Sequence, residues 1–456
     1  MLAGSGTAGA YQAGVLRALH EAGIKIDLVA GRGTGVIGAM FSAMDGGARL
    51  WDDNGVWRRP SAGRFYRWRR PLRVAGWAVA AAGAVLALPI AILAVAAAIA
   101  LTGMLLTFIG LDAAGTTANA AYSRFVETLF APTAVPTYVP RLAVLAALVA
   151  VVAAGAGIIA STFSHRAKRR TAHGLAGRLI GGPLSAAALV ESCCAELWNL
   201  IRGAAPLASP PAAELGRRYV ELVAENLGQP GFRELLVVAH DMDTRRDLVF
   251  ALLAQNHRSR FFTRPGGESA ARTAEAFDLG GAARDHAIDA LSAALAMPMA
   301  TEPHLVTFAP EGPWRGETHR LCDRPGSLVR VLEEVAAAGA EQVILVTALP
   351  PQGRPHELGA ERGDLRGHAA DSLAAFETAG VRDALEHWSG RFLGFFVVRP
   401  PHNPLGPLDF EGVYDERSDR VHGLAELVDR GYEDAYRQFI EPVVAASGDL
   451  LEAVQR

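Results

Sequence analysis

The sequence predicts an α/β protein with a mostly parallel sheet, interrupted by an inserted transmembrane helical hairpin. Three observations support this prediction. Short β-rich runs alternate with helical patterns through much of the chain, which is typical of a parallel sheet covered by helices. Two long segments in the first half carry no ionisable side chain. Basic clusters flank these two segments on their outer sides, as they flank membrane helices.

The composition also indicates a membrane protein and gives no sign of nucleic-acid binding. Half of the 456 residues are hydrophobic and 20% are charged, which is apolar for a soluble protein. The formal net charge of −3 provides no general attraction to nucleic acid. Abundant alanine and scarce lysine favour a bacterial source. The three cysteines show no metal-ligand spacing, so we expect reduced thiols.

The expected elements follow from periodicity and from glycine stops. A helical pattern runs from Gly9 to Gly23 and ends at a glycine. We predict a buried strand from Ile26 to Ala30 and a helix from Val36 to Met44. Further β-rich runs lie beyond the apolar segments, with one helix among them: Leu235 to Ala239, Leu328 to Ala338 (the helix), Val343 to Thr347 and Phe395 to Val398.

The apolar segments run from Val74 to Leu111 and from Leu142 to about Phe163. Both exceed or match the roughly 20 residues that one bilayer crossing requires. A break near Pro89 would make three crossings and would place one basic cluster outside, so we favour two crossings with both clusters in the cytoplasm. The clusters are Arg58, Arg59, Arg64, Arg67, Arg69, Arg70 and Arg73 before the first segment, and Arg166, Lys168, Arg169 and Arg170 after the second.

Three parts of the chain follow from this reading. Residues 1–57 form the N-terminal part of the α/β domain, and residues 58–170 form the hairpin insertion with its basic flanks. Residues 171–456 form the rest of the domain and a C-terminal helical region. We expect a protein integral to the bacterial cytoplasmic membrane, with its main domain in the cytoplasm.

A glycine-rich run, Gly4-Ser5-Gly6-Thr7-Ala8-Gly9, directly precedes the first helix. Glycine permits a tight turn that exposes backbone N–H groups at a helix N-terminus, where an anion or oxyanion can bind. A dinucleotide-binding turn has a similar pattern but requires an acidic residue at the end of the second strand. Asp27 lies at the start of that strand, and this mismatch argues against a dinucleotide site.

A second motif, Gly31-Arg32-Gly33-Thr34-Gly35, joins the predicted second strand to the next helix. This is the pattern of a nucleophile elbow, G-x-S-x-G, in which the central residue lies at a sharp and exposed turn. The central residue here is Gly33, which has no side chain.

The segment from Gly4 to Met40 resembles the opening of the patatin-like phospholipase family. The order and spacing of the glycine-rich turn, the Tyr-Gln-Ala-Gly-Val-Leu helix, the Asp-Leu-Val-Ala-Gly strand and the elbow fit that family. The resemblance covers most of the chain except the hairpin. It implies a three-layer α/β/α patatin-like domain that cleaves lipid acyl esters with a Ser–Asp dyad and no cofactor or metal. It also implies an oxyanion hole formed by the backbone at Gly4, Ser5 and Gly6.

The dyad aspartate of the family lies in a D-G-G or D-G-A turn before a helix and a further strand. Asp323 occupies the matching place in this chain, but Arg324 and Pro325 replace the glycines. Proline lacks an N–H and fixes φ, so the turn is expected to differ. With serine absent at position 33, Thr34 and Ser5 are the nearby hydroxyls that could replace it.

Three hypotheses about function remain open. The preferred one is a membrane-anchored patatin-like protein that binds lipids or acyl esters and is catalytically impaired. The second is an active lipid acyl hydrolase with a non-standard nucleophile or a water activated by Asp323. The third is a membrane scaffold that keeps the fold only as an interaction platform.

Several polar residues outside these motifs invite other readings. The run His240-Asp241-Met242-Asp243 could suggest a metal cluster, but a polar loop after a strand is the simpler interpretation. We interpret His286, His304 and His319 as surface or structural residues, because no serine elbow is present to pair with them.

We predict that both ends of the chain face the cytoplasm, because cationic clusters flank both apolar segments. In a cysteine-free background, new cysteines at Thr117 or Thr133 should react with an impermeant maleimide added outside intact cells. Cysteines at Ser61 or Thr171 should react only after the cells are opened. External labelling at either of these last two positions would contradict the hairpin.

Overall fold

The computed structural model describes residues 1–129, 131, 135–163, 182–263, 273–310, 314–351, 365–403, 405–415 and 417–444. The chain divides into two compact units, which are described separately. The first contains Met1–Arg67 together with Leu184–Arg456, and the second contains Trp68–Pro183.

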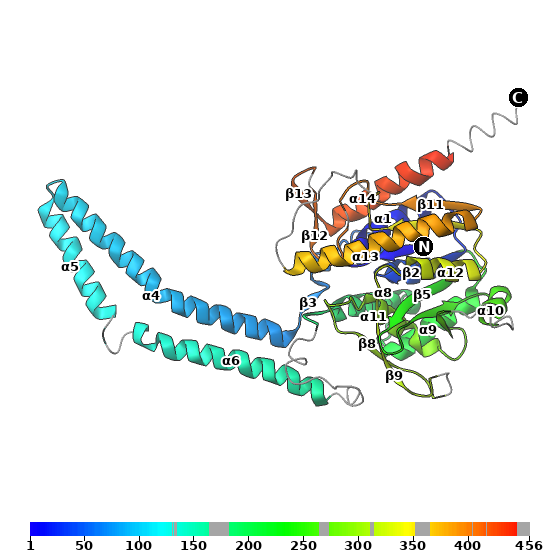
Figure 1. The fold of residues 1–456 in the computed structure, drawn as a ribbon, viewed down its shortest axis with the longest axis horizontal. Coiled ribbons are helices and arrows are strands. Elements are labelled where there is room, and N and C mark those ends of the chain that lie inside the picture. Colours follow the sequence, from blue (N-terminus) through cyan, green and yellow to red (C-terminus); the bar gives the residue numbers. More distant parts are fainter. Residues whose placement is uncertain are drawn as a thin grey trace, which may run out of the picture. The chain divides into compact units, whose positions relative to one another are not determined.

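Within the described residues, a nine-stranded sheet forms the centre of the first unit (Figure 1). Its main order is β11-β10-β1-β2-β5-β6-β7, with β9 paired to β5 and β8 to β9. The five strands from β11 to β5 are parallel, whereas β6 and β9 run antiparallel to β5. The strands are β1 (Leu2–Gly4), β2 (Leu28–Gly33), β5 (Glu234–Asp241), β6 (Arg246–Leu252), β7 (Glu275–Asp278), β8 (His304–Thr307), β9 (Thr318–Cys322), β10 (Gln342–Thr347) and β11 (Gly394–Val398).

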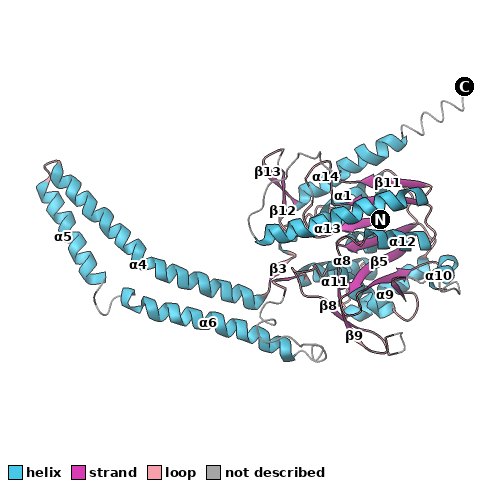
Figure 2. Ribbon diagram, viewed as in Figure 1, coloured by secondary structure: helices cyan, strands magenta, loops and turns pink. Residues whose placement is uncertain are grey.

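Helices cover both faces of this sheet, as Figure 2 shows. Successive side chains of a strand point to opposite faces. Leu235 and Val237 of β5 accordingly join one apolar core, and Leu236 and Val238 join another. The first core includes side chains of α1, α2, α8, α9, α11 and α14, and the second those of α10, α12 and α13. The helices are α1 (Ala8–Glu21), α2 (Gly35–Ser42), α3 (Ala48–Trp51), α8 (Ala187–Arg202), α9 (Ala212–Asn226), α10 (Gln255–Phe262), α11 (Ala287–Leu295), α12 (Leu328–Ala337), α13 (Leu365–Trp388) and α14 (Leu424–Ala435).

The predicted α/β class with a mostly parallel sheet is therefore confirmed, but one strand boundary was wrong. The second strand runs to Gly33 and does not end near Ala30. It continues because Gly31, Arg32 and Gly33 pair with Leu2, Ala3 and Gly4 of β1. The antiparallel strands β6 and β9, and a separate hairpin of β12 (Gly412–Asp415) and β13 (Arg420–Gly423), were not predicted.

The second unit is helical and consists of α4 (Arg70–Phe108), α5 (Asp112–Leu129) and α6 (Val135–Phe163). Helix α4 is continuous through Pro89, as the two-crossing prediction requires, and it packs against α5 and α6. Its stretch Leu72–Phe108 contains an 18-residue window with a mean hydropathy of 2.8, and it is the one helix of the described residues that is long and apolar enough to cross a membrane. Only 6% of that window is buried in the protein, unlike a core helix.

The second predicted crossing is represented by a shorter apolar run, Arg141–Ala153, within the described part of α6. The hairpin with two crossings thus stays a prediction. Residues 58–67, which the sequence had suggested as part of the insertion, belong to the α/β unit. Arg58 forms an ion pair with Asp429 there, and Arg59 forms one with Glu196. A two-stranded sheet of β3 (Arg67–Trp68) and β4 (Leu184–Ser185) stands at the two ends of the insertion.

Helices α1 and α14 pack at unusually short range through two glycines. A Cβ atom on Gly14 would lie 1.8 Å from the carbonyl oxygen of Val428, and one on Gly431 would lie 2.0 Å from that of Tyr11. The Tyr11 hydroxyl also donates a hydrogen bond of 2.9 Å to Asp434. This contact holds the helix that follows the glycine-rich turn.

We predict that Gly14→Ala lowers the free energy of unfolding by about 1–3 kcal/mol, because backbone must move to admit the methyl group. Thermal unfolding of the full-length protein in detergent measures the change. The control is Gly216→Ala in α9, where the nearest atom is at an ordinary 3.4 Å and alanine favours the helix. Equal unfolding temperatures for the wild type and Gly14→Ala would contradict the close packing.

Candidate functional site

The candidate site lies where β1 and β2 end side by side. Gly4 and Gly33 are paired in register as the last residues of these strands. Asp323 follows β9, and its N–H donates to the carbonyl of Ala296 at 2.8 Å. A Cβ atom on Gly33 would lie 3.0 Å from Oδ2 of Asp323. The structure therefore brings together the elbow apex, the glycine-rich turn and the carboxylate that the sequence had suggested.

Gly33 has a backbone conformation that side chains disfavour. Its φ is +56°, which lies in the left-handed region where glycine is preferred. A Cβ atom here would lie only 2.1 Å from the carbonyl oxygen of Gly4. That oxygen thus occupies the space in which a nucleophile's side chain would begin.

The same carbonyl also engages a potential oxyanion donor. In a nucleophile elbow, the N–H of the residue after the nucleophile helps to form the oxyanion hole. The corresponding N–H belongs to Thr34, and it donates to the carbonyl of Gly4 at 2.9 Å. The Thr34 hydroxyl donates to the same oxygen at 3.3 Å and is buried. In this arrangement Thr34 is not a free surrogate nucleophile.

The remaining glycines of the two motifs are positions of close backbone approach. A Cβ atom on Gly31 would meet the backbone of Gly35 at 2.8 Å, and one on Gly35 would meet the carbonyl oxygen of Leu2 at 2.4 Å. A Cβ atom on Gly6 would lie 2.6 Å from the carbonyl oxygen of Pro407. The segment around Pro407 therefore packs directly on the glycine-rich turn.

Ser5 provides the hydroxyl that contacts the candidate dyad carboxylate. Its Oγ donates a hydrogen bond of 2.8 Å to Oδ2 of Asp323. A serine–aspartate pair is thus present, although its serine comes from the glycine-rich turn and not from the elbow.

Arg32 is the unexpected residue of the site. It is fully buried, and its Nη1 donates to both carboxylate oxygens of Asp323 at 2.9 and 3.0 Å. Its Nη2 pairs with Glu377 of α13, which also accepts from the N–H of Gly326 at 2.9 Å. Burial lowers the pKa of the guanidinium, but the two carboxylates outweigh burial and raise that pKa above its usual value. Arg32 therefore stays charged, and its guanidinium engages both oxygens of the Asp323 carboxylate.

Arg324, which directly follows Asp323, points to another carboxylate. Its guanidinium donates to both oxygens of Asp247, at 2.9 and 2.5 Å, and His240 contacts the same carboxylate at 2.8 Å. Burial raises the pKa of Asp247, but hydrogen bonds from His240 and Arg324 lower it to about 2. Arg324 is thus held away from Asp323 by an ion pair with β6.

Aromatic side chains surround the turn and the carboxylate. Tyr66 stacks on Phe410 with ring centroids 4.4 Å apart, and burial together with the negative charge of Asp323 raises the pKa of its hydroxyl. Trp57 packs beside Gly9, at the start of α1, and makes an edge contact with Phe65. These rings provide an apolar wall next to the site.

The thiol nearest to the site is a poor nucleophile. Cys322 directly precedes Asp323, and burial raises its pKa to about 12. Because the thiolate is the reactive form of cysteine, Cys322 is inert at neutral pH.

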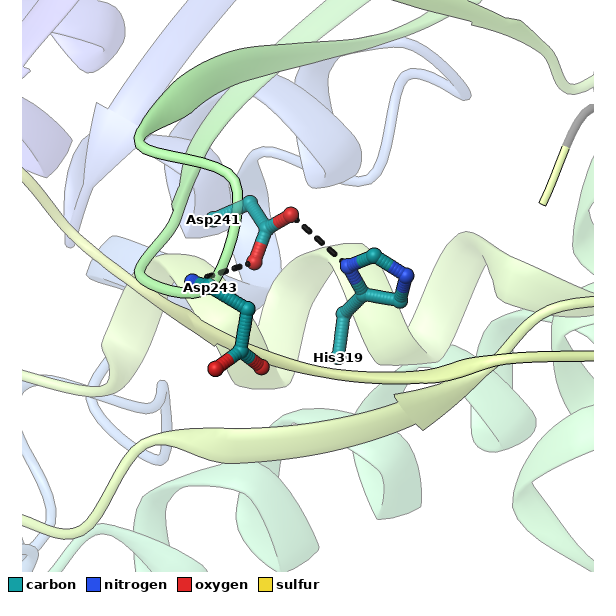
Figure 3. Close-up of side chains that lie close together, drawn as sticks. All are labelled: Asp241, Asp243 and His319. Atoms are coloured by element: carbon teal, nitrogen blue, oxygen red, sulfur yellow. Dashed lines mark hydrogen bonds and ion pairs between the residues drawn. The ribbon is translucent and has the colours of Figure 1, made fainter. Parts of the chain in front are cut away.

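A separate group of potential metal ligands is formed by Asp241 and Asp243, at the end of β5 and in the turn after it, together with His319 of β9 (Figure 3). Asp241 accepts hydrogen bonds from the Asp243 N–H at 2.9 Å and the Thr244 hydroxyl at 2.5 Å, and it contacts His319 Nδ1 at 2.8 Å. Asp243 accepts from the backbone and the guanidinium of Arg320. Protein donors thus engage both carboxylates.

Sequence reasoning missed Arg32 and Glu377. Arg32 could have been identified from the sequence, because it is a charged residue between two glycines at the end of a buried strand. Glu377 carried no signal, because its role depends on how α13 packs. No family model, curated protein or solved structure matches the chain.

We predict that Arg32→Met destabilises the protein by about 3–5 kcal/mol, because two buried carboxylates then lose their cation. Adding Asp323→Asn should recover part of this loss, since it removes one of the two charges. Denaturant unfolding of the four proteins of this double-mutant cycle measures the coupling. Lys25→Met is the control, because its ion pair with Asp27 is exposed and should change stability by less than about 1 kcal/mol. Strictly additive effects of the two site variants would contradict the buried pair.

Proposed function

We propose that this chain is a membrane-anchored, patatin-like protein that binds lipid acyl groups without efficient hydrolysis. The observation that carries the proposal is that other groups occupy the positions that a serine–aspartate dyad would need. The Gly4 carbonyl fills the nucleophile's space, and Arg32 binds the carboxylate that would act as base. Acyl transfer requires an activated nucleophile and free oxyanion donors, and this arrangement supplies neither at the elbow.

Lipid binding is supported by the apolar surroundings of the site and by the spanning helix. Trp57 and Tyr66 are buried and Phe410 is partly buried, so the surroundings of the site are apolar, as those of an acyl chain must be. Tyr66 also lies two residues before Trp68, where the helical insertion begins. The chain therefore passes from the candidate site into the unit that carries α4 with almost no linker.

A second candidate function, active hydrolysis with Ser5 as nucleophile, is favoured by one specific contact. The Ser5 hydroxyl lies 2.8 Å from Asp323, which is the contact that a base needs to accept its proton. The ion pair with Arg32 opposes this role because the guanidinium already donates to both oxygens of that carboxylate.

We predict that the wild-type protein does not react with a fluorophosphonate probe, because such probes require an activated hydroxyl. It should also turn over no p-nitrophenyl ester above the rate of a Ser5→Ala, Asp323→Asn control. Labelling that maps to Ser5 and disappears in Asp323→Asn would replace the first candidate by the second.

A phospholipid with a photoreactive group at the end of an acyl chain tests binding. Under the proposal, cross-links occur near Tyr66 or Phe410 as well as on α4, and excess unlabelled phospholipid suppresses those at the site. Cross-links confined to residues 68–183 would instead indicate a scaffold without a lipid site.

A further inference from the structure

Apart from Arg69, the arginines before the apolar segment fall into two groups that differ in their partners. Arg58 and Arg59 are engaged by carboxylates of the α/β unit. Arg64, Arg67, Arg70 and Arg73 are exposed, and none of them forms an ion pair with another described residue. We call these four residues the arginine segment.

The arginine segment does not stabilise helix α4. Arg70 and Arg73 lie in the first turn of that helix, which contains no acidic residue. The helix dipole disfavours positive charge at this end, so the two cations oppose local helix formation. Four like charges within ten residues, none paired with a carboxylate among the described residues, also repel one another. An external anion would relieve this repulsion.

The position along the chain identifies the anion's source. The segment ends at the point where the membrane-spanning stretch Leu72–Phe108 begins. Trp68 and Trp77 are 59% and 77% exposed, and exposed tryptophans at the end of a spanning helix mark the level of the lipid headgroups. Guanidinium groups bind phosphate through two parallel hydrogen bonds and reach it with long side chains.

We propose that the arginine segment binds the headgroups of anionic phospholipids. This inference requires α4 to lie in a membrane, but it does not depend on the acyl site proposed above. A basic cluster directly beside a spanning helix is attracted to an anionic bilayer surface, and each residue contributes a factor of about five to the binding constant. The protein should therefore bind two lipids that have the same acyl chains but different headgroups with different affinities.

Native mass spectrometry of the full-length protein in detergent tests the proposal. Phosphatidylglycerol and phosphatidylcholine with identical acyl chains are added in equal amounts, so that any acyl site contributes equally to both. We expect phosphatidylglycerol adducts to exceed phosphatidylcholine adducts at least about tenfold at low salt, and the excess to shrink as salt increases. Equal adducts of the two lipids at low salt would overturn the proposal whatever the state of the acyl site.

The variant that removes the segment is Arg64→Gln, Arg67→Gln, Arg70→Gln, Arg73→Gln. It should lower the affinity for phosphatidylglycerol about a hundredfold or more and leave phosphatidylcholine unchanged. The matched control, Arg245→Gln, Arg391→Gln, Arg417→Gln, Arg420→Gln, removes the same charge from exposed positions of the α/β unit. If the first variant keeps its affinity for phosphatidylglycerol, or if the control loses as much affinity, the arginine segment is not the binding site. The salt dependence of the wild type stays informative if the first variant fails to fold.

Discussion

The buried pair between Arg32 and Asp323 is the interaction on which the rest of the site depends. It joins the end of strand β2 to the loop after β9, and Arg32 also pairs with Glu377 of α13. These segments are far apart in the chain. A fully buried guanidinium is costly unless carboxylates lie within hydrogen-bonding distance of it. Taking the ions out of water is costly, so such a pair contributes more to which segments meet than to net stability.

The turn at Gly33 depends on close backbone contacts of its own. Gly33 has a positive φ, and the strand, the turn and the following helix approach one another so closely that Gly31 and Gly35 have no room for a side chain. The carbonyl of Gly4 lies against the turn and accepts the N–H of Thr34. The main polar groups of the turn therefore have partners within the protein.

The sequence predicted the parts of this arrangement that depend on local pattern. The strand-turn-helix units around Gly4 and Gly33 follow from glycine spacing, and Asp323 was found because a helix and a strand follow it in order. The antiparallel strands were missed because β6 and β9 are defined by their pairing with β5, which no local pattern encodes. The partners of Arg32 and Arg324 were missed for a related reason: ion pairs across the fold depend on tertiary placement. The aromatic pair of Tyr66 and Phe410 joins two segments from opposite sides of the insertion and had no signal in either.

The central place of β1 in the sheet has a consequence for how the protein is made. Leu2 of β1 pairs on one side with Gly31 and on the other with Val346 of β10. The N-terminal strand therefore leaves the ribosome long before one of its two neighbours exists, and at ordinary rates of translation the wait is on the order of tens of seconds. During that interval α4 is synthesised, and the edge of β1 that later pairs with β10 is open to wrong partners. If α4 enters a membrane, its capture before the sheet closes would hold each nascent chain apart from its neighbours.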